Sequence, residues 1–202
     1  MPTPHWKVVW RRRLAKYSRW LHIYLSMTSF VIVLCFAVTG ITLNHPDWFA
    51  DLARTTQAQG SVDAAWTNTG AADVRKTEIV ASLRRRGVIG AVGEFRVEDQ
   101  QCSVSFKGPG YSADATIDRL TGKYDLTESR LGLVAVLNDL HKGRDTGAAW
   151  AVVIDLAAGL LALVSLTGLV LLYFIHKHRV AGIVLLLFGG ALAALAYRIW
   201  VP

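Results

Sequence analysis

LHIYLSMTSFVIVLCFAVTGITL, residues 21–43, decides how this chain folds. The stretch runs for 23 residues without Asp, Glu, Lys or Arg, and a helix of that length can cross a hydrocarbon core of about 30 Å. It is also longer than the apolar core of a signal peptide, which has about 7–15 residues. We therefore expect an uncleaved transmembrane helix over residues 20–45, preceded by a basic N-terminal segment over residues 1–19.

Two more apolar stretches follow near the C-terminus. Residues 148–175 are interrupted by one charge, Asp155, and residues 180–200 form the next stretch. Because HKHR, residues 176–179, is a tight connection, the two stretches should form a helical hairpin. With 52% hydrophobic residues and a mean hydropathy of +0.34, the chain is too apolar for an ordinary soluble domain, yet 18% charged residues is too many for a bare bundle. The predicted fold class is a membrane α-helical bundle of three transmembrane helices with a small α+β domain.

The net charge of +7 is unevenly distributed. Basic residues lie before the first apolar stretch and directly after the second: Lys7, Arg11, Arg12, Arg13, Lys16, Arg19, Lys177 and Arg179. Lys and Arg in these places mark the cytoplasmic side of membrane helices rather than a nucleic-acid footprint. We expect a multi-pass protein of the bacterial inner membrane with a cytoplasmic N-terminus, in contact with membrane lipid and without a nucleic-acid partner.

Residues 46–147 are expected to form a small periplasmic domain. KTEIVASLRRR, residues 76–86, has apolar side chains on one side of a helix, and residues 131–140 have the same spacing. Apolar and polar residues alternate as in strands over three segments: residues 94–98, 102–106 and 112–117. The part through Gly70 is polar and weakly patterned. The domain is therefore predicted to be α+β with a small antiparallel sheet.

The sequence lacks the motifs of several kinds of chemistry. Cys35 lies within the first span and Cys102 in the outer domain, so the two are not expected to form a disulfide. The absence of CxxCH argues against covalently attached haem. GxSxG, HExxH, and the glycine patterns of dinucleotide-binding and P-loop folds are also absent. Hydrolase chemistry is not indicated, and any electron donor would be external, a quinol or a flavoprotein.

Short motifs at three places give the chain a family resemblance. RWLH (residues 19–22) leads into a span that contains Thr39-Gly40, DRLTGK (118–123) closes the outer domain, and LHKG (140–143) precedes the second span. In this layout the chain resembles the family of inner-membrane proteins with PepSY-associated transmembrane helices. Larger relatives have four spans and more than one PepSY unit, whereas this chain has three spans and one PepSY-like unit. Some relatives are haem-containing ferric-siderophore reductases, and others are known only as peptidase-associated proteins.

Five of the six histidines lie at the ends of the apolar stretches: His22, His45, His141, His176 and His178. Two imidazoles are what the iron of a non-covalent haem needs as axial ligands. His22 and His45 are separated by about 35 Å along a straight helix, so they belong to opposite sides of the membrane. Taken with the resemblance, this predicts two haem b groups, an outer one on His45 and His141 and an inner one on His22 and His176 or His178. The alternative is that these side chains only meet lipid headgroups and water.

Asp155 is costly inside a span unless it is paired or protonated. It lies within about 60° of both His141 and His176 if one helix continues through all three, whereas His178 lies off that stripe and is the less favoured ligand. Asp155 would then contact a ligating histidine, carry protons, or pair with Arg144 or Lys142. A hydrogen bond that only holds the helices together is the simpler alternative.

Two functions from different classes remain open. The first is electron transfer to a periplasmic acceptor, a ferric siderophore by the resemblance, with Lys142 and Arg144 attracting an anionic complex or only anchoring the chain at the interface. The second is a non-enzymatic module that binds or restrains a periplasmic partner. A homodimer through the smooth face at Gly182, Gly189 and Gly190 would supply more helices around the haems.

Overall fold

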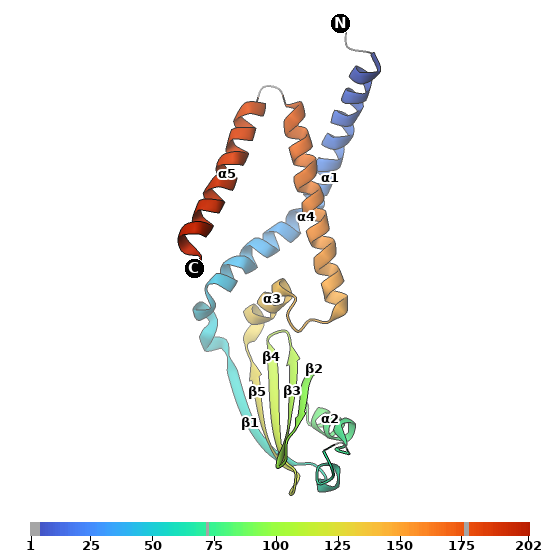
Figure 1. The fold of residues 1–202 in the computed structure, drawn as a ribbon, viewed down its shortest axis with the longest axis vertical. Helices are drawn as coiled ribbons and strands as arrows, with labels where there is room; N and C mark the ends of the chain where they lie inside the picture. Colours follow the sequence, from blue (N-terminus) through green and yellow to red (C-terminus); the bar gives the residue numbers. More distant parts are fainter. Residues whose placement is uncertain (1–4, 72, 176–177) are drawn as a thin grey trace. The chain divides into compact units, whose positions relative to one another are not determined.

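A computed structural model describes residues 5–71, 73–175 and 178–202. The chain divides into two compact units, which we call the helical unit (residues 1–34 and 155–202) and the sheet unit (residues 35–154). Figure 1 shows the elements of each unit along the chain. Two long helices, α1 (His5–Asn44) and α4 (Ala148–Phe174), contribute residues to both units.

Three helices are long and apolar enough to cross a membrane, which confirms the predicted fold class. The candidate spans are Val9–Asn44, Ala148–Phe174, and α5, which runs from Arg179 to Trp200. Helix α1 begins at His5, well before the expected residue 20. Residues 5–39 contain neither Pro nor Gly, and Lys and Arg are good helix formers, so the basic segment continues the helix. The helix ends at Asn44, two residues before Pro46.

The packed side of α1 in the helical unit combines two serines with a histidine and a leucine. Ser18, His22, Leu25 and Ser29 recur at intervals of three or four residues, and each is buried or half-buried while most of their neighbours are exposed. This spacing is that of one helix face. Small side chains let two helices approach closely in a membrane, and this face carries a histidine among them.

Gly182 lies at a contact between α5 and α4 of the same chain. A Cβ atom there would lie far closer than 3.0 Å to the side chain of Leu172, so α5 packs tightly against α4 at this point. A Cβ atom at Gly189 or Gly190 would meet nothing within 4 Å. The smooth surface on which the dimer prediction depends is therefore limited to Gly189 and Gly190, and dimerisation stays a prediction.

The sheet unit contains five antiparallel strands in the order β1-β5-β4-β3-β2. Their bounds are β1 Arg54–Ser61, β2 Ala91–Val97, β3 Gln101–Gly108, β4 Tyr111–Asp118 and β5 Lys123–Arg130. Sequence patterning did not predict β1, because RTTQAQGS has no alternation of apolar residues. The strand forms because its backbone pairs with β5 along all eight positions, Arg54 opposite Arg130 through Ser61 opposite Lys123.

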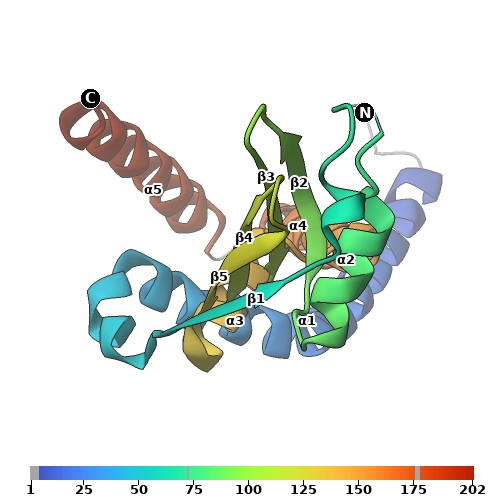
Figure 2. The same cartoon turned by 90° about the horizontal axis from the view of Figure 1, so that it is seen from below.

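One face of the sheet is covered and the other is open. Helix α2 (Lys76–Arg85) packs Ile79 and Leu83 against fully buried residues of β3 and β4, and Figure 2 shows this helix beside the sheet. Core residues of the two strands include Cys102, Val104, Phe106 and Ile117. Burial raises the pKa of the Cys102 thiol, and both cysteines are free.

The DRLTGK segment, residues 118–123, holds several turns of the sheet unit together through hydrogen bonds. Asp118 Oδ1 accepts hydrogen bonds from the backbone N–H and the hydroxyl of Thr121, each 2.7 Å long. These bonds, the hydroxyl first, lower the pKa of Asp118. The Arg119 guanidinium donates to four backbone carbonyls, those of Thr67, Thr69, Glu98 and Asp99. The segment therefore joins the β4–β5 turn to the β2–β3 turn and to the chain that follows β1.

Candidate functional site

His22 lies on the packed side of α1, against α4. Its Nδ1 atom is 2.9 Å from the Thr167 hydroxyl oxygen and 3.1 Å from the carbonyl oxygen of Val164. The Thr167 hydroxyl donates its own hydrogen to that same carbonyl, at 2.9 Å. Both partners can thus only accept from the ring, so Nδ1 carries the hydrogen. In the neutral imidazole the lone pair is then on Nε2.

Gly168 makes this close approach possible. A Cβ atom at this position would be 3.2 Å from Cε1 of His22 and 3.7 Å from Nδ1. The imidazole therefore lies directly over a side-chain-free part of α4. Even an alanine Cβ atom would require the ring to shift slightly, so glycine suits this close approach.

His141 repeats the arrangement in the sheet unit. It lies in the last turn of α3 (Gly132–Lys142), and its Nδ1 atom is 2.5 Å from the hydroxyl oxygen of Thr39. That hydroxyl donates to the carbonyl of Cys35 at 2.7 Å, so it accepts from the imidazole N–H. Gly40 is the neighbour here, 3.9 Å from Cε1 when given a Cβ atom, and the Phe36 ring lies 4.6 Å from the imidazole.

The same local geometry thus occurs twice. In each case a histidine from one helix faces a Thr-Gly pair on another, Nδ1 is bound to the hydroxyl, and Nε2 keeps its lone pair. This is the state that a metal-ligating imidazole needs, with its second nitrogen held by an outer partner. Thr39-Gly40 belongs to the motif at the first span, whereas Thr167-Gly168 has no distinguishing sequence context, and its role becomes visible only where α1 packs against α4.

The family assignment agrees with this layout. Residues 16–202 match a family model described as "Putative PepSY_TM-like". The chain belongs to the PepSY_TM-like family. No curated protein and no solved structure matches it. The match begins near the first span and includes the sheet unit and both Thr-Gly pairs.

The remaining histidines of this PepSY_TM-like chain are arranged differently. His45 follows α1 and precedes the 3₁₀ helix Pro46–Leu52, and its ring stacks on Trp48 at 4.1 Å with an interplanar angle of 4°. His178 is exposed at the start of α5, and His176 lies outside the described residues. Within the ranges given above, no hydrogen bond or ring contact joins His45 to His141, and no three His, Cys, Asp or Glu side chains cluster as metal ligands.

The continuous helix assumed for the phase of Asp155 is wrong. Helix α3 ends at Lys142, Gly143 adopts a left-handed φ of 69°, and α4 begins at Ala148. The phase relation between His141 and Asp155 therefore does not hold. Asp155 is exposed on α4 and makes no hydrogen bond or ion pair with another described residue.

Arg144 has a structural partner in Asp139. The Asp139 side chain is 6% exposed, and its Oδ1 accepts from Nε of Arg144 at 3.0 Å and from Nη2 at 2.5 Å. Its Oδ2 accepts from the Gly110 N–H at 2.8 Å. One carboxylate thus ties the β3–β4 turn, α3 and the following loop together. Lys142 and Arg144 also line a groove of about 300 Å³ between α3 and the segment around Pro46.

Asp139→Ala should lower the free energy of unfolding of the sheet unit by about 2–4 kcal/mol, because it leaves a buried N–H and an arginine without their acceptor. Arg144→Ala removes a partner that is 60% exposed and should cost about 1 kcal/mol or less. Urea unfolding of the full chain in mild detergent, followed by tryptophan fluorescence, measures both. Equal losses for the two variants would contradict a central role for the carboxylate.

Proposed function

We propose that this chain is a b-type haem protein of the bacterial inner membrane that moves electrons across the membrane. The observation that carries this proposal is the pair of held imidazoles. His22 and His141 each have Nδ1 bound to a threonine hydroxyl, which leaves Nε2 as the ligating nitrogen. Haem iron takes such nitrogens as axial ligands, and bound haem would supply one-electron chemistry.

The residues have separate tasks in this proposal. His22 would hold an inner haem and His141 an outer one. Thr167 and Thr39 orient the two imidazoles and fix their tautomers, while Gly168 and Gly40 leave room for the rings. His176 and His45 are proposed as the second ligands, with His178 as the alternative to His176. The apolar side chains of α1 and α4 would keep water away from the inner haem.

The distribution of charge supports the proposed direction of electron flow. The basic start of α1 would face the cytoplasm, where a quinol or a flavoprotein supplies electrons. The sheet unit would face the periplasm, where a ferric siderophore is the proposed substrate. The groove lined by Lys142 and Arg144 offers positive charge to an anionic complex, although Asp139 neutralises part of it.

Purification after haem-replete expression tests the proposal. The protein should show a Soret band and the spectrum of a low-spin haem with two imidazole ligands, whereas a colourless protein would end the proposal. His22→Ala and His141→Ala should each remove one haem and leave the other. As matched variants, Thr167→Val and Thr39→Val keep the side-chain shape and should weaken haem binding about 10–100-fold at their own site. Unchanged spectra in both histidine variants would refute the ligand assignment.

The second candidate is a membrane-anchored binding module without enzymatic activity. It is favoured by the open face of the sheet, where Gln57, Gln59, Asp114, Thr116 and Asp125 are exposed. A polar, uncovered sheet face can present hydrogen-bonding groups to a protein partner. This candidate predicts that function survives replacement of the five span-end histidines, which the electron-transfer proposal forbids.

A further inference from the structure

Positive charge accumulates where α1 begins. The segment contains Arg11, Arg12, Arg13, Lys16 and Arg19, and Arg179 opens α5. The sequence has no Asp or Glu in residues 1–46 or 156–202. The helical unit therefore has one acidic residue, Asp155, which lies 19 positions before the end of α4 at Phe174, a rise of roughly 28 Å.

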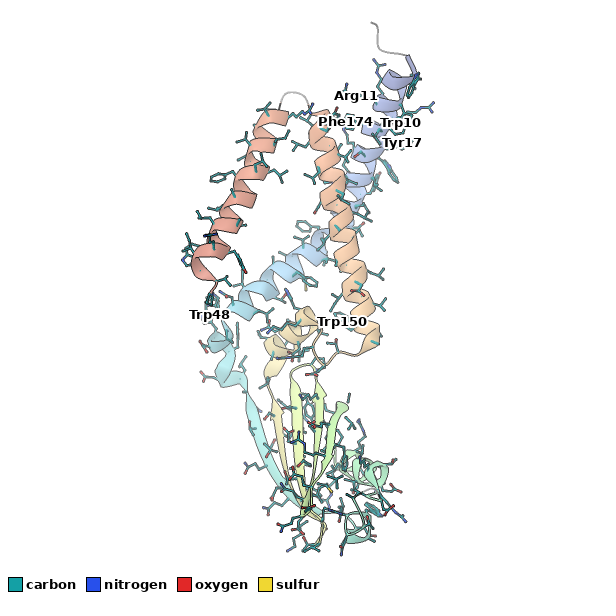
Figure 3. The ribbon with its side chains drawn as sticks, in the orientation of Figure 1. Trp10, Arg11, Tyr17, Trp48, Trp150 and Phe174 are labelled. Carbon is teal, nitrogen blue, oxygen red and sulfur yellow. The ribbon has the colours of Figure 1, made fainter. Side chains whose placement is uncertain are left out.

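A pocket of about 360 Å³ lies at this end of the helical unit. It is lined by Trp6, Trp10, Arg11 and Leu14 of α1 and by Tyr173 and Phe174 of α4. Figure 3 shows Trp10, Arg11 and Phe174 at the same end of these two helices. The pocket combines an apolar aromatic wall with a guanidinium group.

A second guanidinium lies beside the same wall. Arg179 is 4.3 Å from the centroid of the Tyr173 ring, and Arg11 is 5.9 Å from it. Trp10 is 64% exposed and Tyr173 is 51% exposed, so the aromatic surface is open to an occupant. Both guanidinium groups therefore lie within 6 Å of one aromatic ring centroid, and a nearby anion would stabilise two cations placed beside the same ring.

We infer that this pocket binds an anionic phospholipid. Arg11 and Arg179 each supply a guanidinium group beside the aromatic wall, and a guanidinium can make two parallel hydrogen bonds to the oxygens of a phosphate. The wall formed by Trp10, Leu14 and Phe174 continues into the spans and fits an acyl chain. Basic segments next to membrane helices attract anionic lipid headgroups, and tryptophan side chains favour the membrane interface. A free phosphate ion would leave the apolar wall unused.

This site is independent of the proposed electron transfer, because it uses none of the histidines. The full chain in neutral detergent is titrated with mixed micelles of phosphatidylglycerol or phosphatidylcholine at equal total lipid, and separately with inorganic phosphate. Phosphatidylglycerol should raise the thermal unfolding midpoint at the lowest concentration. Native mass spectrometry of the purified chain should show one retained anionic phospholipid. Equal responses to the two lipids, or an equal response to phosphate alone, would overturn the inference.

Substitutions locate the site. The double variant Arg11→Gln with Arg179→Gln should weaken phosphatidylglycerol binding at least tenfold. Arg198→Gln removes a cation from the last turn of α5, outside the pocket, and should change binding less than twofold. A similar loss in both variants would mean that only net charge matters, and the specific pocket would be refuted. If the double variant does not fold, native mass spectrometry of the natural chain tests the inference instead, and the absence of a retained anionic phospholipid would overturn it.

Discussion

Gly122→Ala should lower the free energy of unfolding of the sheet unit by about 3–5 kcal/mol, a large part of the stability of a small domain. Gly122 has a φ of 68°, which disfavours any residue with a Cβ atom. The new Cβ atom would also collide with the backbone oxygen of Val62 and lie 3.1 Å from the backbone nitrogen of Ala64. These atoms cannot move aside easily, because the Val62 N–H donates to the Gly122 carbonyl at 2.9 Å.

Gly87→Ala is the matched control. Gly87 also has a left-handed φ, 100°, but a Cβ atom there would meet nothing within 4 Å. This variant should cost about 1 kcal/mol, from backbone strain alone. Urea unfolding of the full chain in mild detergent, read by hydrogen exchange at the amides of β4 and β5, separates the two effects. If the two variants lose the same stability, the collision with Val62 is not what makes Gly122 necessary.

The three spans and most of the sheet unit could be predicted because their signals are local. An apolar run of 23 residues identifies a span without reference to any other part of the chain. The helical spacing of residues 76–86 likewise corresponds to α2, Lys76–Arg85. Strand β1 is different, since its eight residues have no apolar periodicity and are held by the backbone of β5. Because β1 depends on pairing with β5, the sequence of β1 alone does not predict a strand.

The break between α3 and α4 has a signal in the sequence. The loop contains Gly143 and Gly147, both with positive φ, and glycine after a helical stretch is a common helix end. The candidate site was only partly accessible from sequence. His22 and His141 stood out by their positions, but their threonine partners lie 145 and 102 residues away. Such pairings depend on how the helices pack, and a Thr-Gly dipeptide alone is too common to indicate them.

Gly168→Leu should remove haem from the His22 site, with at least a tenfold loss of affinity, if His22 is a ligand as proposed. The leucine side chain would occupy the space of the imidazole, whose Cε1 atom is 3.2 Å from a Cβ atom at this position. The ring would have to leave, and its bonds to Thr167 and Val164 would break. Outer partners of this kind commonly contribute 10–100-fold to metal affinity.

Gly159→Leu is the control on the same helix, since a Cβ atom at Gly159 meets nothing within 4 Å. Both substitutions replace glycine by a better helix former, so a difference between them reports the contact with His22 rather than helix stability. Haem per protein should fall by about half in Gly168→Leu, with the His141 site retained, and should be unchanged in Gly159→Leu. Thermal unfolding in detergent gives a readout that does not depend on haem, because the α1–α4 contact weakens in the first variant alone. Full haem content in Gly168→Leu together with a lowered unfolding midpoint would show that His22 only joins the two helices.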